Sequence, residues 1–491
     1  MKHIFTVFII FLTITLNAKT LYVSVDGNDS GSGENIENPL KTITKAISLV
    51  NPGDIIYVRG GVHSYSSTIY ISKSGNQVDT CFLMAYPGEH PILDFSGTQF
   101  GKRGISLTGD YWHIKGFDFV YAGDNGMNIS GGGNNVIEFC SFYENKDTGL
   151  QMGNGAHDNT VKNCDSYYNA DPPDYGDADG FAPKLDVGSN NKFIGCRAWG
   201  NCDDGWDGYM RGASNVTTIL ENCWTWGNGY LKDGTDPGAK ANGNGFKMGG
   251  GDNSNNLNLT HHFYLTNCIA FNNKAKGFDQ NNNVGTMSLI NCTGYNNITS
   301  NFRIKKVLAA GETLAVKNSV SYNGRVELGG FAIQETNSWI VPFIVNEEDF
   351  VSLDASTAST PREADGSLPD IEFLHLASGS DLIDAGVDVG LPFQGTAPDL
   401  GAFEFTLSTG IQQLSNNTIV YSTNEYLIIR FQNRITESID CRLFNINGQL
   451  ISQSKANSEV HQIFWQGFKS GIYIPNPNRF SGKIFSNALE E

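Results

Sequence analysis

Between about residues 110 and 324 the chain has no long segment with the 3.6-residue period of a helix, and its apolar positions follow a different repeat. The repeated unit is a cysteine, an aromatic residue three positions later and an asparagine two positions beyond that. The six cysteines are Cys140, Cys164, Cys196, Cys223, Cys268 and Cys292. Neighbouring units are never closer than the 24 residues between Cys140 and Cys164. This minimum, with longer insertions elsewhere, predicts coils of three strands whose loops bulge on one side.

Stacked coils place equivalent residues roughly 4.8 Å apart, so each residue type of the unit becomes a column. The aromatic column is Tyr143, Tyr167, Trp199, Trp226, Phe271 and Tyr295, and the asparagine column is Asn145, Asn169, Asn201, Asn228, Asn273 and Asn297. Asparagine tolerates left-handed backbone and can bond its amide to the next rung, so this column needs no catalytic explanation. Rung spacing would permit disulfides. Stacked side chains point the same way, however, and nine cysteines is an odd number, so we predict buried free thiols.

The start of the chain predicts export. Met1 to Ala18 has a short basic start, an apolar run from Ile4 to Leu16 and small residues at its end, which are the features of a signal peptide. The alternative is a membrane anchor, but a run of this length is too short to span a bilayer, which needs about 20 residues. We therefore expect residues 1–18 to be removed and the protein to be secreted or held at the cell surface.

The segment after the signal peptide predicts a strand, a glycine-rich loop, one amphipathic helix and a second strand. The first strand and loop run from Leu21 to Gly33, and the second strand lies within Pro52 to His63. The helix between them has its apolar residues at Ile43, Ala46, Ile47 and Val50. This order resembles the N-terminal cap of secreted right-handed parallel β-helix proteins. A solenoid needs such a cap because its first rung would otherwise expose an apolar end.

Three phrases between residues 177 and 250 share a polar residue, a glycine and a large apolar residue. They begin at Asp179, Asp204 and Asn244. If their glycines form one column, Asp179 lies one rung below Asp204, and Lys247 lies one rung above Asp207. Clustered carboxylates are costly unless a cation neutralises them, and oxygen ligands without histidine or thiolate favour calcium over zinc. The alternative is a solvated face on an acidic chain.

The longer phrases around these residues resemble a known family. They are D-A-D-G-F-A from Asp177, C-R-A-W-G-N-C-D-D-G-W-D from Cys196, G-N-G-F-K-M-G-G from Gly243 and K-G-F-D-Q-N-N-N from Lys276. Together they resemble the family 9 polysaccharide lyases, calcium-dependent pectate lyases on a ten-coil parallel β-helix. The resemblance covers about residues 21 to 405. It implies Ca²⁺ as cofactor, Lys247 as the base, and calcium ligands at Asp179, Asp203, Asp204 and Asp207.

This chemistry suits the charges of the chain. A uronic acid linked through O4 can be cleaved by removing its C5 proton, and a cation on the carboxylate stabilises the charge that develops. The chain has 51 acidic and 33 basic residues and a formal charge of −18, so a metal would supply the local positive charge that a polyanion needs. A lysine base must be neutral, which requires a pKa well below about 10.4. Calcium would lower that pKa and neighbouring aspartates would raise it.

Two more basic residues are candidates for binding substrate. Lys276 opens a phrase shared with the family, and Arg303 would continue the Lys247 column and could hold a carboxylate. The predicted partner is a pectate polysaccharide. We expect no nucleic-acid partner, no membrane span and a monomeric state.

Other functions remain open at this stage. A polygalacturonase-type hydrolase on the same fold would use paired carboxylates, and Asp203-Asp204 with Arg303-Ile304-Lys305 is a faint match, but the expected glycine-histidine-glycine between them is missing. A lyase for another uronic-acid polymer is a further alternative. A non-catalytic surface adhesin would suit the repeats, but it would leave the aspartates and Lys247 without a purpose.

The repeat fades after Asn337, and the segment that ends at Phe405 resembles the closing turn of secreted β-helix proteins. The predicted catalytic domain is therefore residues 19–405, followed by a linker at 406–417. Residues 418–491 predict a small β-sandwich, with Asn447-Gly448 at a tight hairpin. Its phrases resemble sorting domains of type IX secretion, and a carbohydrate-binding module is the alternative. The predicted fold class is thus all-β, a right-handed parallel β-helix with an N-terminal cap and a C-terminal β-sandwich.

Overall fold

The computed structural model describes residues 18–405, 418–422, 426–431, 438–444, 450–458, 460–464 and 474–475. Contacts within the chain divide it after Phe405 into two units. The predicted signal peptide (apart from Ala18), the linker at 406–417 and the hairpin at Asn447-Gly448 lie outside the described residues. Among those described, no helix has the length and apolar character needed to cross a membrane.

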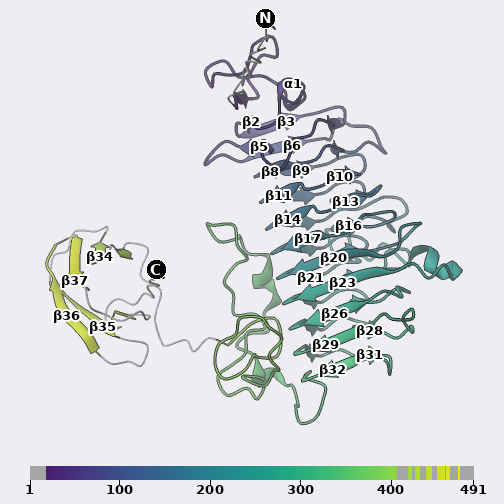
Figure 1. Cartoon of the computed structure of the whole chain (residues 1–491), viewed down its shortest axis with the longest axis vertical. Helices are drawn as coiled ribbons and strands as arrows, with labels where there is room; N and C mark the ends of the chain where they lie inside the picture. Colours follow the sequence, from purple (N-terminus) through teal and green to yellow (C-terminus); the bar gives the residue numbers. More distant parts are fainter. Residues whose placement is uncertain are drawn as a thin grey trace, which may run out of the picture. The chain divides into compact units, whose positions relative to one another are not determined.

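The first unit is a parallel β-helix whose coils follow one another along its axis (Figure 1). Ten coils contribute one strand to each of three parallel sheets, and two further strands extend sheet A, so the sheets have 12, 10 and 10 strands. Sheet A contains β1 (Thr20–Val23), β2 (Ile55–Val58), β5 (Cys81–Ala85), β8 (Trp112–Lys115), β11 (Val136–Glu138), β14 (Thr160–Lys162), β17 (Asn191–Ile194), β20 (Val216–Glu221), β23 (His261–Thr266), β26 (Met287–Ile290), β29 (Leu314–Lys317) and β32 (Ile333–Glu335). The predicted β-helix of about ten coils is confirmed.

The other two sheets have ten strands each. Sheet B contains β3 (Gly61–Ser64), β6 (Pro91–Asp94), β9 (Asp118–Val120), β12 (Ser141–Tyr143), β15 (Asp165–Tyr167), β18 (Arg197–Trp199), β21 (Trp224–Trp226), β24 (Ile269–Phe271), β27 (Thr293–Tyr295) and β30 (Val320–Tyr322). Sheet C contains β4 (Ile69–Ile71), β7 (Ile105–Leu107), β10 (Met127–Ser130), β13 (Leu150–Gly153), β16 (Phe181–Pro183), β19 (Trp206–Asp207), β22 (Phe246–Lys247), β25 (Lys276–Asp279), β28 (Ser300–Ile304) and β31 (Val326–Leu328).

The helix α1 (Ile43–Leu49) covers the first coil, as the sequence predicts (Figure 1). Thr42 caps it by accepting a hydrogen bond from the backbone N–H of Lys45, which satisfies one of the free donors of the first turn. Ile43, Ala46 and Ile47 are buried and join the interior of the coils. Three short 3-10 helices complete the unit: η1 (Gly251–Asn255), η2 (Glu347–Asp349) and η3 (Ala355–Ser359).

The cysteine column lies inside the coils as free thiols. The eight cysteines in the described part of the chain are all buried and form no disulfide. The column thiols donate to backbone carbonyls, as Cys196 does to Val161 at 3.4 Å. They therefore fill space in the interior without cross-linking it.

The asparagine column forms a continuous side-chain ladder from Asn145 to Asn301. From Asn145 to Asn273 each amide Nδ2 donates to the Oδ1 of the next rung at 2.9–3.1 Å, and that Oδ1 also accepts the backbone N–H of the rung below. Asn301, four residues after Asn297, ends the ladder by accepting from Asn297 Nδ2 at 2.9 Å. The ladder satisfies buried polar groups at the turns between sheets B and C, so it holds the loops that carry the candidate site.

We expect Asn201→Ala to destabilise the β-helix, because the fully buried Asn201 bonds to rungs on both sides. Removing it leaves buried partners unsatisfied, at a cost of about 1–3 kcal/mol. Urea unfolding measures the change. Asn38→Ala is the control, since this asparagine is exposed and should change stability by less than about 0.5 kcal/mol. Equal effects of the two variants would contradict a stabilising ladder.

Residues 338–405 pack back along the outer face of sheet B, an arrangement that the sequence does not predict. Phe373 packs against Phe271 with ring centroids 4.8 Å apart, and Phe403 packs against Trp224 at 5.9 Å. Arg362 reaches Asp165 of β15 at 2.6 Å. This segment therefore buries aromatic residues of sheet B that would otherwise face solvent.

The second unit contains two three-stranded antiparallel sheets in its described part. One sheet has the order β33-β34-β37 and the other β36-β35-β38. The strands are β33 (Thr418–Ser422), β34 (Tyr426–Phe431), β35 (Ile439–Phe444), β36 (Leu450–Ala456), β37 (Val460–Phe464) and β38 (Ile474–Pro475).

Candidate active site

The three polar-glycine-apolar phrases lie on neighbouring rungs, where the turns from sheet B enter sheet C. The strands β16, β19 and β22 are hydrogen-bonded neighbours, and Asp207 pairs in register with Lys247. The glycine of each phrase permits close packing: a Cβ on Gly205 would lie 2.0 Å from Oγ1 of Thr225. The predicted column is thus confirmed, and it places the polar residues at one edge of sheet C.

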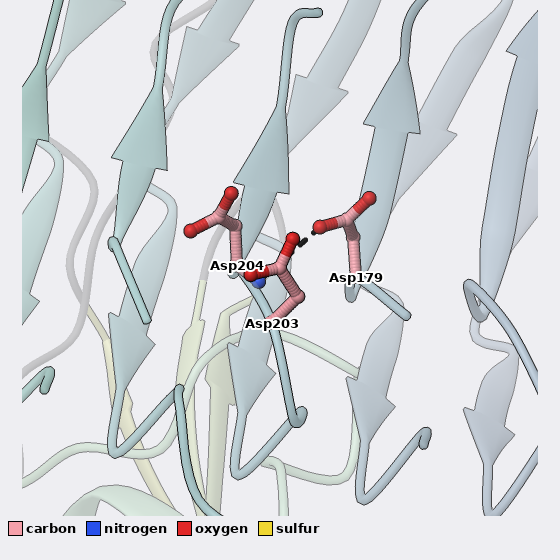
Figure 2. A group of neighbouring side chains, drawn as sticks. All are labelled: Asp179, Asp203 and Asp204. Atoms are coloured by element: carbon pink, nitrogen blue, oxygen red, sulfur yellow. Dashed lines mark hydrogen bonds between the residues drawn. The ribbon is translucent and has the colours of Figure 1, made fainter. Parts of the chain in front are cut away.

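Asp179, Asp203 and Asp204 form a buried carboxylate triad, shown in Figure 2. One oxygen from each lies within 4.8 Å of the others, and their exposed fractions are 0%, 1% and 0%. The backbone N–H of Asp204 donates to Asp179 Oδ1 at 3.2 Å. Burial and mutual repulsion raise the pKa of Asp203 well above its usual value, with Asp204 as the main repelling charge. Such a triad is stable as carboxylates when a cation joins it.

The hydrogen bonds of the triad leave two buried oxygens without a hydrogen-bond partner among the described residues, Asp204 Oδ2, which has Lys247 Nζ at 2.8 Å as an ion-pair contact, and Asp203 Oδ2. Asp203 Oδ1 accepts from the backbone N–H of Asn242 at 2.5 Å, and Asp204 Oδ1 accepts from the backbone and side chain of Asn244 at 2.7 and 2.8 Å. Asp203 Oδ2 is buried and has no hydrogen-bond partner among the described residues. A buried carboxylate oxygen without a donor is costly, and a metal ion is one group that removes the cost. The residues therefore fit a bound metal.

Asp207 lies beside the triad but is not one of its three carboxylates. Its Oδ1 lies 3.2 Å from Lys247 Nζ, and its Oδ2 lies 3.6 Å from Lys184 Nζ. Two lysines thus share its carboxylate. The structure brings all four predicted aspartates to one site, with Asp207 on the side that faces the lysines.

Lys247 lies between the triad and Asp207. Its Nζ lies 2.8 Å from Asp204 Oδ2, and its exposed fraction is only 6%. Burial alone would lower the pKa of Lys247, but Asp204 and Asp207 outweigh burial and raise the pKa well above its usual value. Lys247 is therefore a cation when these carboxylates are not otherwise neutralised.

Lys184 belongs to the same site, although the columns of the repeat do not predict it. Its Nζ lies 2.8 Å from Asp179 Oδ2, and only 7% of the residue is exposed. Burial disfavours its charge, but Asp179 and Asp207 raise the pKa of Lys184 above its usual value. The available signal was its place in D-A-D-G-F-A-P-K-L, one position past the end of β16.

The lysines open onto a cleft with a volume of about 410 Å³. Lys184, Lys247 and Asp207 line it, together with Arg103 and Arg211. Other lining residues come from earlier coils, namely Asp124, Asn125, Asp147 and Gln151. The cleft therefore extends from Lys247 toward the N-terminal coils.

The two predicted substrate-binding residues lie on the other side of Lys247, outside the cleft lining. Asp279 pairs with Lys247 in register, and Arg303 pairs with Asp279, so Arg303 stands two rungs beyond Lys247. Lys276 Nζ lies 2.9 Å from Asp279 Oδ2, and Arg303 Nη1 lies 3.0 Å from Glu327 Oε2. Both cations already have carboxylate partners.

The fold and the site define a parallel β-helix protein with a carboxylate triad and two lysines at a cleft on one sheet. Residues 21–322 match the family model described as "Pel9A-like, right handed beta helix region". The chain belongs to this family.

Similar proteins extend over most of the chain. "Pectate lyase L" of Paenibacillus polymyxa is 41% identical over 407 residues, which are 77% of this chain and 85% of that protein. "Pectate lyase L" of Dickeya chrysanthemi is 37% identical over 408 residues, 80% of this chain and 92% of that protein. The crystal structure of pectate lyase Pel9A is 36% identical with a TM-score of 0.73, and the match covers 80% of this chain and 98% of that one.

Proposed function

We propose that the protein is a pectate lyase that cleaves (1→4)-α-D-galacturonan by β-elimination and leaves 4,5-unsaturated oligogalacturonides. The observation that carries the proposal is Lys247 between buried carboxylates at an open cleft. Membership of the Pel9A-like family and the names of its relatives support the same activity.

The cation of the site is proposed to be calcium, held by Asp179, Asp203 and Asp204 with Asp207 beside them. The charges support a divalent ion. Four carboxylates carry −4, and the two lysines carry +2, or +1 when Lys247 is the neutral base, which leaves −2 or −3 to be neutralised. Oxygen ligands without histidine or thiolate suit calcium. When bound, calcium supplies positive charge next to the substrate carboxylate, which stabilises the negative charge that develops on proton removal.

Lys247 is proposed to act as the general base. Its neutral amine takes the C5 proton of a galacturonate, the C5–H electrons form the C4=C5 double bond, and the C4–O4 bond breaks. The leaving O4 takes a proton from water and becomes a new hydroxyl, and the hydroxide that remains takes the proton from Lys247, which restores water and the neutral amine. Each cut thus produces one unsaturated end and one reducing end, and no water adds across the bond.

Lys184 holds Asp179 and Asp207 in place in this proposal, because its ammonium contacts both carboxylates. It also offsets part of their repulsion before the metal arrives. Lys276 and Arg303 remain candidates for holding substrate carboxylates on the rungs beyond Lys247. To do so, each would have to exchange its present carboxylate partner for the substrate.

We expect the cleavage rate to rise with pH across the neutral and alkaline range. Only the neutral amine of Lys247 can accept a proton, and the surrounding aspartates raise its pKa, so the active fraction grows as pH increases. Initial rates at saturating calcium, measured at a series of pH values, test this expectation. An optimum in the acid range would instead indicate a protonated carboxyl acting as general acid, as in a hydrolase.

A panel of polymers tests the substrate. Polygalacturonate should give an unsaturated product in the presence of calcium, whereas alginate and rhamnogalacturonan should give little. A greater rate on either of the latter would assign the site to another uronic-acid polymer. Binding without any cleavage of the panel would favour the adhesin alternative.

We also propose that the protein is exported and acts outside the cell as a monomer, with residues 418–491 serving as a sorting domain of type IX secretion. The apolar run at Ile4 to Leu16 and the phrases of the C-terminal unit support this. Secretion by cells that have type IX machinery, compared for the full chain and for a chain ending at Phe405, tests the role of the second unit. Equal secretion of both would favour the carbohydrate-binding alternative.

A further inference from the structure

A second hollow, with a volume of about 740 Å³, lies on the turns that connect sheets B and C. Its lining includes the aromatic residues Tyr121, Tyr168 and Tyr175 and the basic residues Lys146 and Lys232. We call it the tyrosine pocket. The elimination chemistry at Lys247 does not use it.

The tyrosines of the pocket occupy backbone positions that disfavour bulky residues. Their φ angles are 58° at Tyr121, 57° at Tyr168 and 56° at Tyr175, all in the left-handed region. Tyr121 and Tyr168 follow strands β9 and β15, and other rungs have glycine or asparagine at the same position, including Gly200 and Asn272. Glycine and asparagine adopt this conformation readily. Glu144 has the same conformation on the rung between Tyr121 and Tyr168, and Tyr111 and Phe139 have it outside the pocket, so what distinguishes the pocket is that three such tyrosines line one hollow.

Two of the tyrosines are spaced along the axis of the coils. Glu144 stands on the rung between Tyr121 and Tyr168, so these two tyrosines are two rungs, or about 10 Å, apart. The ring of Tyr168 lies against the next rung, where a Cβ on Gly200 would come within 2.8 Å of it. Gly200 therefore leaves room for the ring beside the backbone. Tyr121 is 43% exposed, which is high for a side chain of its size.

The lining of the pocket is less acidic than the chain as a whole, so its charges suit an anionic ligand. Lys232 Nζ lies 2.7 Å from Glu144 Oε1 and 5.5 Å from the ring centroid of Tyr168, so it neutralises the nearest acid. Lys146 is exposed and has no ion-pair partner among the described residues. Asp233 also lines the pocket and is exposed, so the two lysines and two acids of the lining cancel, on a chain with a formal charge of −18. Lys146 is the lysine of the lining that is left to pair with a ligand.

One loop separates the tyrosine pocket from the cleft. Ala170, Pro172 and Tyr175 line the pocket, while Gly176 and Asp177, the next residues of the same loop, line the cleft. A polymer chain bound in the pocket would therefore be held close to the candidate catalytic residues.

We propose that the tyrosine pocket is a second carbohydrate-binding site, which holds a uronic-acid segment of the polymer away from the point of cleavage. The apolar C–H faces of sugar rings pack on Tyr121 and Tyr168, whose ring faces are electron-rich, and Lys146 pairs with a carboxylate. The identity of the polymer rests on the proposed function. A second site on one chain raises the affinity for a long polymer by multivalency and leaves short substrates unaffected.

The test uses the full chain with the double substitution Tyr121→Asn and Tyr168→Asn. Asparagine is the residue that other rungs use at this position, so the turns should keep their conformation and the melting temperature should stay the same or rise. Tyr111→Asn is the control, because Tyr111 also has a positive φ of 56° but lies outside the pocket lining.

Binding is measured as retardation in native gels containing polygalacturonate, with a chelator present so that no cleavage takes place. The double variant should bind the polymer roughly tenfold more weakly, whereas the control should bind as the parent does. The kcat/KM of the double variant on a short oligogalacturonate with calcium should equal that of the parent.

Parental retardation of the double variant would overturn the proposal, and so would a loss of binding accompanied by a lower melting temperature or lower activity on the short substrate. The gels report binding alone, so a protein that fails to cleave pectate would refute the proposed function without altering this result.

Discussion

Replacing Lys247 with alanine should reduce the cleavage of polygalacturonate by about three orders of magnitude, within the range that a positioned general base contributes. No other described lysine contacts both Asp204 and Asp207. Lys184 contacts Asp207 through the other carboxylate oxygen and forms its shorter ion pair with Asp179. Initial rates of unsaturated product formation at saturating calcium measure the effect. Lys192→Ala, at an exposed lysine of β17, is the matched control and should keep parental activity.

Lys247→Arg separates a base from a charged contact. Arginine can still pair with Asp204 and Asp207, but it keeps its proton at any working pH. We therefore expect this variant to be almost as inactive as the alanine variant while melting near the parental temperature. If Lys247→Arg retained most of the activity, Lys247 would be an ion-pair partner only, and the base would have to be sought elsewhere in the cleft.

Removal of calcium should have an effect of similar size. Excess chelator should abolish product formation, and added calcium should restore it. Calcium should also raise the melting temperature of the parent, because an ion that binds only the folded state stabilises it. This second measurement detects binding without relying on activity.

Asp203→Asn should weaken calcium binding by roughly 10- to 100-fold, since the affinity of a calcium site depends on the number of its charged ligands. Asp203 is suited to the test because its Oδ2 has no partner among the described residues and its Oδ1 bonds only to the backbone of Asn242. Calcium titrations followed by melting temperature measure the shift. Asp381→Asn, at an exposed aspartate, should leave the titration unchanged. A calcium-dependent melting temperature that Asp203→Asn does not alter would place the metal elsewhere.

Much of the fold was predictable because, in a solenoid, residues at equivalent positions of successive coils lie side by side. The cysteine, aromatic and asparagine columns each stack as the repeat implies, with Tyr167 on Trp199 at 4.3 Å as one example. The same logic placed Asp207 beside Lys247, although 40 residues separate Asp204 from Asn244. Glycine phrases fixed the register there, because each glycine allows one backbone to pass close to the next.

Features outside the repeat could not be predicted in this way. Lys184 turns back to Asp179 because β16 ends just before it, and nothing in the spacing of the columns shows where a strand ends. The packing of residues 338–405 on sheet B depends on contacts between aromatic residues about 100 positions apart, such as Phe271 and Phe373. The Glu327 partner of Arg303 was also missed, because it lies one rung further along, beyond Asn297, which ends the last complete copy of the repeated unit.

The central claim is that cleavage is an elimination, and the most direct test counts both new ends in one reaction. The protein is incubated with polygalacturonate and calcium, and the ultraviolet absorbance of the C4–C5 double bond is measured alongside the number of new reducing ends. An elimination produces one unsaturated end for every new reducing end throughout the reaction, and we expect this ratio. New reducing ends without the absorbance would show hydrolysis and would contradict the claim.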